Sequence, residues 1–138
     1  MAKIIVLINP NSNHGKSRRC GDHVCRILDK LGIDYEMDTP DTAEGIREEA
    51  WKAKESGAEK VFVCGGDGTL HQAANGLVEG ETTLCVIPTG RGNDLARALG
   101  ISHDLERAVD IAVNGDRHRM DMGKINERYF LTVATLGF

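Results

Sequence analysis

Short apolar runs alternate with segments of helical periodicity along most of the chain. The runs predict strands at Lys3–Ile8, Asp34–Asp38, Lys60–Cys64 and Leu84–Ile87. Apolar residues at helical spacing predict helices at Ser17–Leu31, Thr42–Ser56, Leu70–Glu79, Asp94–Leu99 and Asp104–Asn114. Strands joined through helices form parallel sheets with right-handed crossovers. The order therefore predicts an α/β fold of three layers, a mostly parallel sheet with helices on both faces.

Two details of this pattern make sharper predictions. Lys3–Ile8 is apolar almost throughout, which is typical of a strand that is buried on both faces. In the first helix, Val24, Leu28 and Leu31 are expected to form the buried stripe, and Gly32 is expected to end the helix.

The last residues depart from the alternation. Arg117–Lys124 and Arg128–Phe138 flank the turn Ile125–Glu127, an arrangement typical of a β-hairpin. The run Tyr129–Phe138 is so apolar that a strand there needs pairing and cover on both sides. We therefore expect the chain to be part of a longer polypeptide.

Composition limits the class of protein. The 138 residues carry a net charge of −4, and aromatic residues make up only 4%, which disfavours a nucleic-acid partner. With neither a signal-peptide pattern nor a membrane-spanning run, we expect a cytoplasmic protein. The four cysteines lack metal-binding spacing, so we expect reduced thiols, with Cys64 and Cys85 buried.

Three glycine-rich loops follow the first, third and fourth predicted strands. They are Asn9–Gly15, Gly65–Thr69 and Pro88–Asp94. In a parallel sheet these loops open on the carboxyl edge, where α/β folds bind ligands. One such loop is more often a plain turn. Three on one edge predict a phosphate-binding site.

The second loop, Gly65–Thr69, carries the strongest signal. Its glycines let the backbone turn N–H groups toward a ligand, and the following helix adds its positive end. Asp67 would repel a phosphate unless a cation lies between them. Alternatively, Asp67 is a turn residue that caps the helix, and Asn93 and Asp94 have the same alternative at the next helix.

Two familiar phosphate motifs do not match. Pro10–Ser17 departs from a Walker A sequence at its first position, where proline replaces the required glycine. The dinucleotide fingerprint Gly-x-Gly-x-x-Gly fails because His71 and Leu95 occupy the places of its last glycine. A P-loop or a Rossmann dehydrogenase is therefore disfavoured.

Several of these residues resemble the catalytic domain of the diacylglycerol kinase family. The resemblance rests on Asn9-Pro10, Gly65-Gly66-Asp67-Gly68-Thr69, Asn75-Gly76, Pro88–Asp94 and Leu95-Ala96-Arg97. The family includes bacterial lipid kinases and sphingosine kinases, and is more distantly similar to NAD kinases and 6-phosphofructokinases. Pairing of the Gly-Gly-Asp-Gly-Thr and Gly-x-Gly-Asn-Asp motifs is specific to the lipid-kinase branch.

The chain departs from the family pattern at three places. Arg91 stands where the family usually has threonine, and it either contacts phosphate or is a solvated loop residue. His71 stands where the family often has asparagine, and we expect it to be a surface or packing residue. Ser12-Asn13 replaces the usual Ser-Gly, although asparagine tolerates the left-handed backbone.

The resemblance implies ATP-dependent phosphorylation of a lipid hydroxyl with Mg²⁺. It implies that Asp67 acts through Mg²⁺ and positions phosphate. The residues expected to line the nucleotide cleft are Asn9, Pro10, Asn11, Ser12, Thr39, Gly65, Gly66, Asp67, Gly68, Thr69, Gly90, Arg91, Gly92, Asn93 and Asp94.

The resemblance also implies a domain organisation and a set of partners. Residues 1–120 would form the nucleotide-binding catalytic domain, and residues 121–138 a hairpin leading into a β-rich C-terminal domain that carries the general base. We expect diacylglycerol or a related lipid as substrate, transient membrane-surface contact, and no turnover by this chain alone. Homodimerisation stays open. The alternatives are a kinase of a soluble substrate such as NAD, or a non-catalytic nucleotide-binding module.

Overall fold

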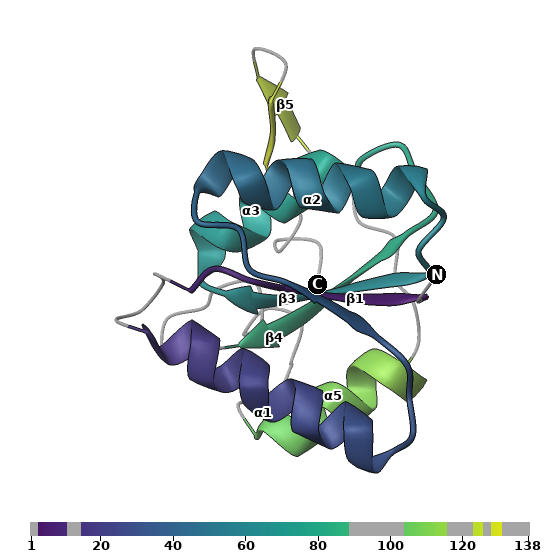
Figure 1. The fold of residues 1–138 in the computed structure, drawn as a ribbon. Helices are drawn as coiled ribbons and strands as arrows, with labels where there is room; N and C mark the ends of the chain where they lie inside the picture. Colours follow the sequence, from purple (N-terminus) through teal and green to yellow (C-terminus); the bar gives the residue numbers. More distant parts are fainter. Residues whose placement is uncertain (1–2, 11–14, 89–103, 116–122, 126–127, 131–138) are drawn as a thin grey trace.

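The sheet is parallel, as the sequence predicts. A computed structural model describes residues 3–10, 15–88, 104–115, 123–125 and 128–130. Its main sheet has the order β2-β1-β3-β4, and each neighbouring pair of strands is parallel (Figure 1). The strands are β1 (Ile4–Ile8), β2 (Glu36–Asp38), β3 (Lys60–Gly65) and β4 (Thr83–Pro88).

Helices cover both faces of this sheet, which confirms the three-layer α/β fold. On one face lie α1 (Lys16–Lys30) and α5 (Leu105–Asn114), and on the other lie α2 (Ala43–Glu55) and α3 (Asp67–Leu77) (Figure 1). The helix expected at Asp94–Leu99 falls outside the described residues. Thr42 and Asp104 cap α2 and α5, because their side chains accept hydrogen bonds from the N–H groups of the first turns.

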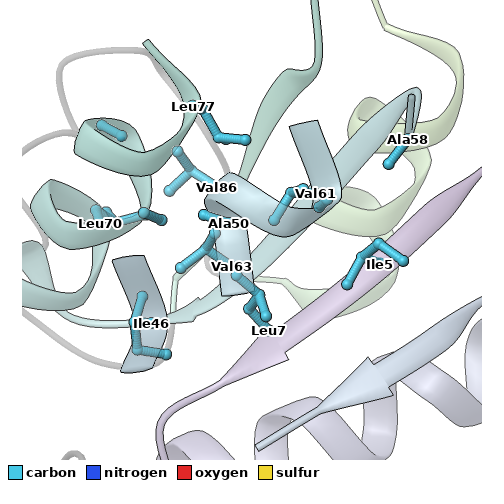
Figure 2. Close-up of a cluster of buried hydrophobic side chains, with 13 residues drawn as sticks. Ile5, Leu7, Ile46, Ala50, Ala58, Val61, Val63, Leu70, Leu77 and Val86 are labelled. Atoms are coloured by element: carbon cyan, nitrogen blue, oxygen red, sulfur yellow. The ribbon is translucent and has the colours of Figure 1, made fainter. Parts of the chain in front are cut away.

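The core is split by the sheet into two apolar clusters. The cluster under α2 and α3 is drawn in Figure 2 and includes Ile5, Leu7, Ile46, Val63 and Leu70. The other cluster lies under α1 and α5, and it contains the strand side chains that point to the opposite face of the sheet. Every residue of β1 is buried, because alternate side chains point to opposite faces of the sheet and helices cover both faces. This confirms the prediction from the apolar run.

The end of α1 corrects the prediction for Leu31. That side chain is 57% exposed, whereas Val24 and Leu28 are fully buried. Gly32 adopts a left-handed φ of 70°, and the Ile33 N–H donates to the Leu28 carbonyl at 3.0 Å. This closing motif turns the chain back, so Ile33 packs against the core in place of Leu31.

The helix α3 ends without a glycine, and this makes a testable prediction. Glu79 follows the C-cap Val78 with φ 62°, a strained value for a residue with a Cβ. We expect Glu79→Gly to raise the free energy of unfolding by about 0.5–1 kcal/mol in urea denaturation. The control variant is Gly57→Ala, which should lower the free energy of unfolding by about 1 kcal/mol, because Gly57 has φ 83° and no described atom within 4 Å of an added Cβ. Stabilisation by both substitutions would contradict the strain at Glu79.

Beyond the main sheet lies a short antiparallel hairpin. The strands β5 (Gly123–Ile125) and β6 (Arg128–Phe130) pair with Lys124 opposite Tyr129, and β6 contacts α3. This confirms a hairpin for these residues, although Ile125 ends β5 instead of lying in the turn. Among the helices that the structure describes, none combines the length and apolarity needed to cross a membrane.

Candidate functional site

The carboxyl ends of the parallel strands meet at one edge of the sheet. Ile8 pairs with Cys64, and Gly65 pairs with Pro88, so the carboxyl ends of β1, β3 and β4 lie side by side. Leu7 pairs with Asp38, which brings the end of β2 to the same edge. The structure thus gathers five predicted positions or segments there: Asn9, Pro10, Thr39, Gly65–Gly66 and Asp67–Thr69. Asn11, Ser12 and Gly90–Asp94 lie outside the described residues.

The segment Gly65–Thr69 is a direct turn from strand into helix. Gly65 ends β3, Gly66 is the N-cap without a side-chain cap hydrogen bond, and Asp67 is the first residue of α3. The hydrogen bonds of the helix begin with the Leu70 N–H, which donates to the Gly66 carbonyl at 3.1 Å. The N–H groups of the first turn therefore point along the helix axis toward the sheet edge.

This early start of α3 corrects two expectations. The helix begins at Asp67 instead of Leu70, because the apolar periodicity becomes visible only after the glycines. Asp67 is also not the capping residue, since Gly66 occupies that position. The carboxylate of Asp67 instead lies within the first turn, where the positive end of the helix stabilises a negative charge.

The three glycines of the turn have different surroundings. A Cβ on Gly65 would lie 2.6 Å from the Thr69 Cβ, so only glycine allows this close contact. A Cβ on Gly66 or Gly68 would meet no atom of the described chain within 4 Å. Among the described residues, the turn is therefore tightly packed at Gly65 and open at Gly66 and Gly68, which leaves room for a ligand near the backbone.

A hydrogen-bond chain continues from Asp67 along α3. His71 Nδ1 lies 2.8 Å from the Asp67 carbonyl oxygen, and Asn75 Nδ2 donates to the His71 carbonyl at 2.8 Å. The imidazole of His71 thus packs on the first turn of the helix. The sequence offers only the i, i+4 spacing as a signal for this contact.

The donor set fits Mg²⁺ held jointly with phosphate. One oxygen of the Asp67 side chain, Oδ1, is buried, and the turn supplies N–H groups for an anion. Across the described part of the chain, no group of three or more His, Cys, Asp and Glu side chains could hold a metal. Mg²⁺ keeps several waters and commonly binds through one or two carboxylates plus substrate phosphates. A single carboxylate beside a phosphate cradle meets that requirement.

A second acidic group, missed by the sequence reasoning, lies at the β2 corner of the edge. Partial burial, and then repulsion from Glu49, raises the pKa of the Asp38 carboxyl above its ordinary value. Asp38 directly precedes the half-buried Thr39. A negative charge on this carboxyl would repel phosphate beside Thr39.

A hollow of the described surface lies at the opposite edge of the sheet. It has a volume of about 470 Å³ and is lined by Lys3, Ile4, Ile33, Asp34, Glu59, Lys60 and Val113. Lys60 Nζ donates to the carbonyls of Ala112 at 2.7 Å and Val113 at 2.8 Å, which caps the end of α5. The charge of Lys60 thus stabilises the fold, and the candidate site remains the carboxyl edge.

Comparison with known proteins gives consistent matches. Residues 3–125 match the family model of the diacylglycerol kinase catalytic domain. The chain is 32% identical over 134 residues to a diacylglycerol kinase of Staphylococcus saprophyticus, covering 96% of this chain and 44% of that protein. It is 33% identical over 134 residues to one from Staphylococcus carnosus, with the same coverage.

A solved structure shares the fold. The crystal structure of a diacylglycerol kinase from Bacillus anthracis strain Sterne has a TM-score of 0.78 and 24% sequence identity, covering 93% of this chain and 47% of that one. The chain spans less than half the length of each of these relatives. Since the family model matches most of its residues, the chain belongs to the diacylglycerol kinase catalytic domain family.

Proposed function

We propose that this chain is the nucleotide-binding part of an ATP-dependent lipid kinase, which transfers the γ-phosphoryl group of ATP to a hydroxyl of diacylglycerol. The observation that carries this proposal is the Gly65–Thr69 turn, open at Gly66 and Gly68 and placed at the N-terminus of α3. Membership of the diacylglycerol kinase catalytic domain family supports the lipid as acceptor.

The residues of the turn have separate roles in this proposal. The N–H groups of Gly66–Thr69 bind and orient the nucleotide phosphates. Asp67 holds Mg²⁺, which neutralises charge on the phosphates when it is bound. His71 keeps the first turn of α3 rigid through its contact with the Asp67 carbonyl. Positioning and charge neutralisation are the main requirements of phosphoryl transfer, and this site supplies both.

The described residues of the site do not offer a group suited to take the proton of the lipid hydroxyl. The relatives are more than twice as long as the part that matches this chain, since that part covers 44% of them. We propose that the general base lies in the corresponding further part of the protein. The chain alone would then bind Mg²⁺ and ATP weakly and would not turn over.

A lipid substrate has a consequence for where the protein acts. Diacylglycerol resides in a bilayer, so the kinase must contact a membrane surface during each turnover. We propose peripheral, transient contact by a cytoplasmic protein.

A substrate panel tests the proposal. The complete protein is incubated with Mg²⁺, γ-labelled ATP and one of three acceptors: diacylglycerol in mixed micelles, a sphingoid base, or NAD. We expect label in phosphatidate. Labelling of NAD alone would favour the kinase of a soluble substrate, and ATP binding without transfer to any acceptor would favour a non-catalytic module.

The open glycines provide a second prediction. We expect Gly66→Ala and Gly68→Ala each to weaken binding of Mg²⁺ and ATP by at least about tenfold, because a methyl group would occupy the space of a phosphate contact. The free energy of unfolding should change by less than about 1 kcal/mol, since the new methyl meets no atom of the described residues within 4 Å. Calorimetric titration and urea denaturation measure the two quantities.

The matched variant is Gly65→Ala. Its Cβ would collide with Thr69, so both stability and binding should fall. Unchanged nucleotide affinity in Gly66→Ala and Gly68→Ala would show that the open side of the turn does not face phosphate.

A further inference from the structure

The outer face of α1 carries a continuous row of basic side chains. Its members are Lys16, Arg19, His23, Arg26 and Lys30, and all five are exposed. They follow one another at intervals of three or four residues, which places them within an arc of about 80° around the helix axis. The buried residues Val24 and Leu28 lie on the other side of the helix. We call this row the basic stripe.

The charge of α1 differs in sign from that of the whole chain. The helix contains five Lys and Arg residues and two Asp residues, a formal charge of +3, whereas the 138 residues together carry −4. Asp22 and Asp29 border one flank of the basic stripe. The ion pairs found among the described residues both lie in α2, so neither of them engages the stripe. The stripe is therefore available to a negatively charged partner.

Helix stability does not explain the basic residues at the start of α1. Lys16, Arg18 and Arg19 lie in its first turn, where positive side chains oppose the positive end of the helix dipole. That turn has no acidic residue, and the N-cap Gly15 offers no side-chain hydrogen bond. The arrangement costs helix stability, which points to a role in binding.

The outer faces of the two helix layers differ in charge. On the opposite face of the sheet, α2 exposes Glu44, Glu48 and Glu55 along its outer side (Figure 1). A flat anionic surface would attract the face that carries α1 and repel the face that carries α2. The charge distribution would therefore orient the molecule on such a surface.

The basic stripe begins close to the candidate site. The Cys20 thiol donates to the Pro88 carbonyl at 3.9 Å, which places the first turns of α1 beside the carboxyl end of β4. Beyond the other end of α1, Ile33 lines the hollow at the opposite edge of the sheet. The helix has 15 residues and is therefore about 22 Å long. A surface that contacts the stripe along this length lies next to the carboxyl edge.

We propose that the basic stripe of α1 is the surface that docks on an anionic lipid bilayer, where its Lys and Arg side chains contact lipid phosphates. This inference rests on the proposed function, in which the acceptor lipid resides in a bilayer. Long basic side chains suit the role, because their stems cover apolar surface while their charged ends reach the headgroups. Leu31 is 57% exposed beside Lys30 and adds an apolar contact at the end of the stripe. The net charge of −4 disfavours a nucleic acid as the partner.

Vesicle sedimentation tests the surface without any turnover. The complete protein is mixed, in the absence of ATP, with vesicles of phosphatidylcholine alone or of phosphatidylcholine and phosphatidylglycerol in equal parts. Neither kind of vesicle contains diacylglycerol, so capture of the substrate cannot contribute. We expect binding to the anionic vesicles only, and loss of this binding at high salt, because ions screen the charges.

Substitutions separate the stripe from the net charge of the protein. Arg26→Gln should weaken binding to the anionic vesicles about fivefold, the contribution of one basic residue near such a surface, and Arg26→Lys should bind like the parent protein. Lys52→Gln is the matched control, because it removes the same charge from an exposed position of α2. It should change binding by less than about twofold. Arg19→Glu combined with Arg26→Glu should weaken binding more than about 100-fold, and urea denaturation checks that each variant is folded.

Several results would overturn the docking surface. They are equal binding to neutral and anionic vesicles, equal loss of binding in Arg26→Gln and Lys52→Gln, and tighter binding to a DNA duplex than to anionic vesicles. Phosphorylation of diacylglycerol distinguishes this inference from the proposed function. Binding to anionic vesicles without phosphorylation would count against the proposed function alone. Phosphorylation by a protein with no preference for anionic vesicles would overturn the docking surface alone.

Discussion

Asp67→Asn is expected to lower the rate of phosphoryl transfer by about 100-fold or more in the complete protein. The substitution keeps the size and shape of the side chain but removes the charge that would hold Mg²⁺ beside the phosphates. The effect should appear in kcat, measured with saturating ATP and diacylglycerol over a range of Mg²⁺ concentrations. The free energy of unfolding should change by less than about 1 kcal/mol, because only one charge near a helix N-terminus is lost.

Glu106→Gln is the matched control for this variant. Glu106 is an exposed acidic residue in the first turn of α5, on the opposite face of the sheet from α3. Removing its charge alters a helix terminus in the same way but leaves the site intact, so kcat should remain close to that of the parent protein. If Asp67→Asn and Glu106→Gln had equal kcat, the proposal that Asp67 holds Mg²⁺ would be contradicted.

Gly76→Ala is expected to lower the free energy of unfolding by about 2–3 kcal/mol. The helices α2 and α3 pack against each other at this glycine. A Cβ on Gly76 would lie 2.4 Å from the Arg47 carbonyl oxygen and 2.8 Å from the Ala50 Cβ. The backbone oxygen cannot rotate away as a side chain could, so the two helices must separate. Urea denaturation followed by circular dichroism measures the loss.

Gly68→Ala in the same helix is the control that distinguishes the effect of packing on stability from the effect of helix propensity. Both substitutions replace glycine with a better helix former, which alone would favour the helix by up to about 1 kcal/mol. Gly68 has no described atom within 4 Å of the added methyl, so this variant should retain or slightly gain stability. Equal destabilisation by the two substitutions would contradict the close packing of α2 on α3 at Gly76.

The sequence was sufficient to predict the parallel sheet and its helices. Strands buried on both faces are continuously apolar, as β1 is, and the helices between them show regular apolar spacing. The first turn of α3 could not be predicted from the sequence, because Gly66 and Gly68 have poor helix propensity and no side chain to show periodicity. At the end of α1, Leu31 and Ile33 are both plausible core residues, and only the reversal at Gly32 selects Ile33.

The candidate site was predicted in part. The position of the Gly65–Thr69 turn at the sheet edge follows from strand order, so the motif was enough to locate it. The different surroundings of Gly65, Gly66 and Gly68 depend on the path of the backbone, which identical residue types cannot reveal.

Nuclear magnetic resonance titration of the chain with Mg²⁺ and ATP tests most directly whether the Gly65–Thr69 turn holds the phosphates. The method detects weak binding, and each backbone amide reports on its own surroundings. We predict that the largest shift changes occur at the amides of Gly66–Thr69 and Asn9, and that they depend on Mg²⁺. Largest changes at Lys3, Ile33 and Lys60 around the opposite edge, or no changes at millimolar ATP, would contradict a nucleotide site at the carboxyl edge.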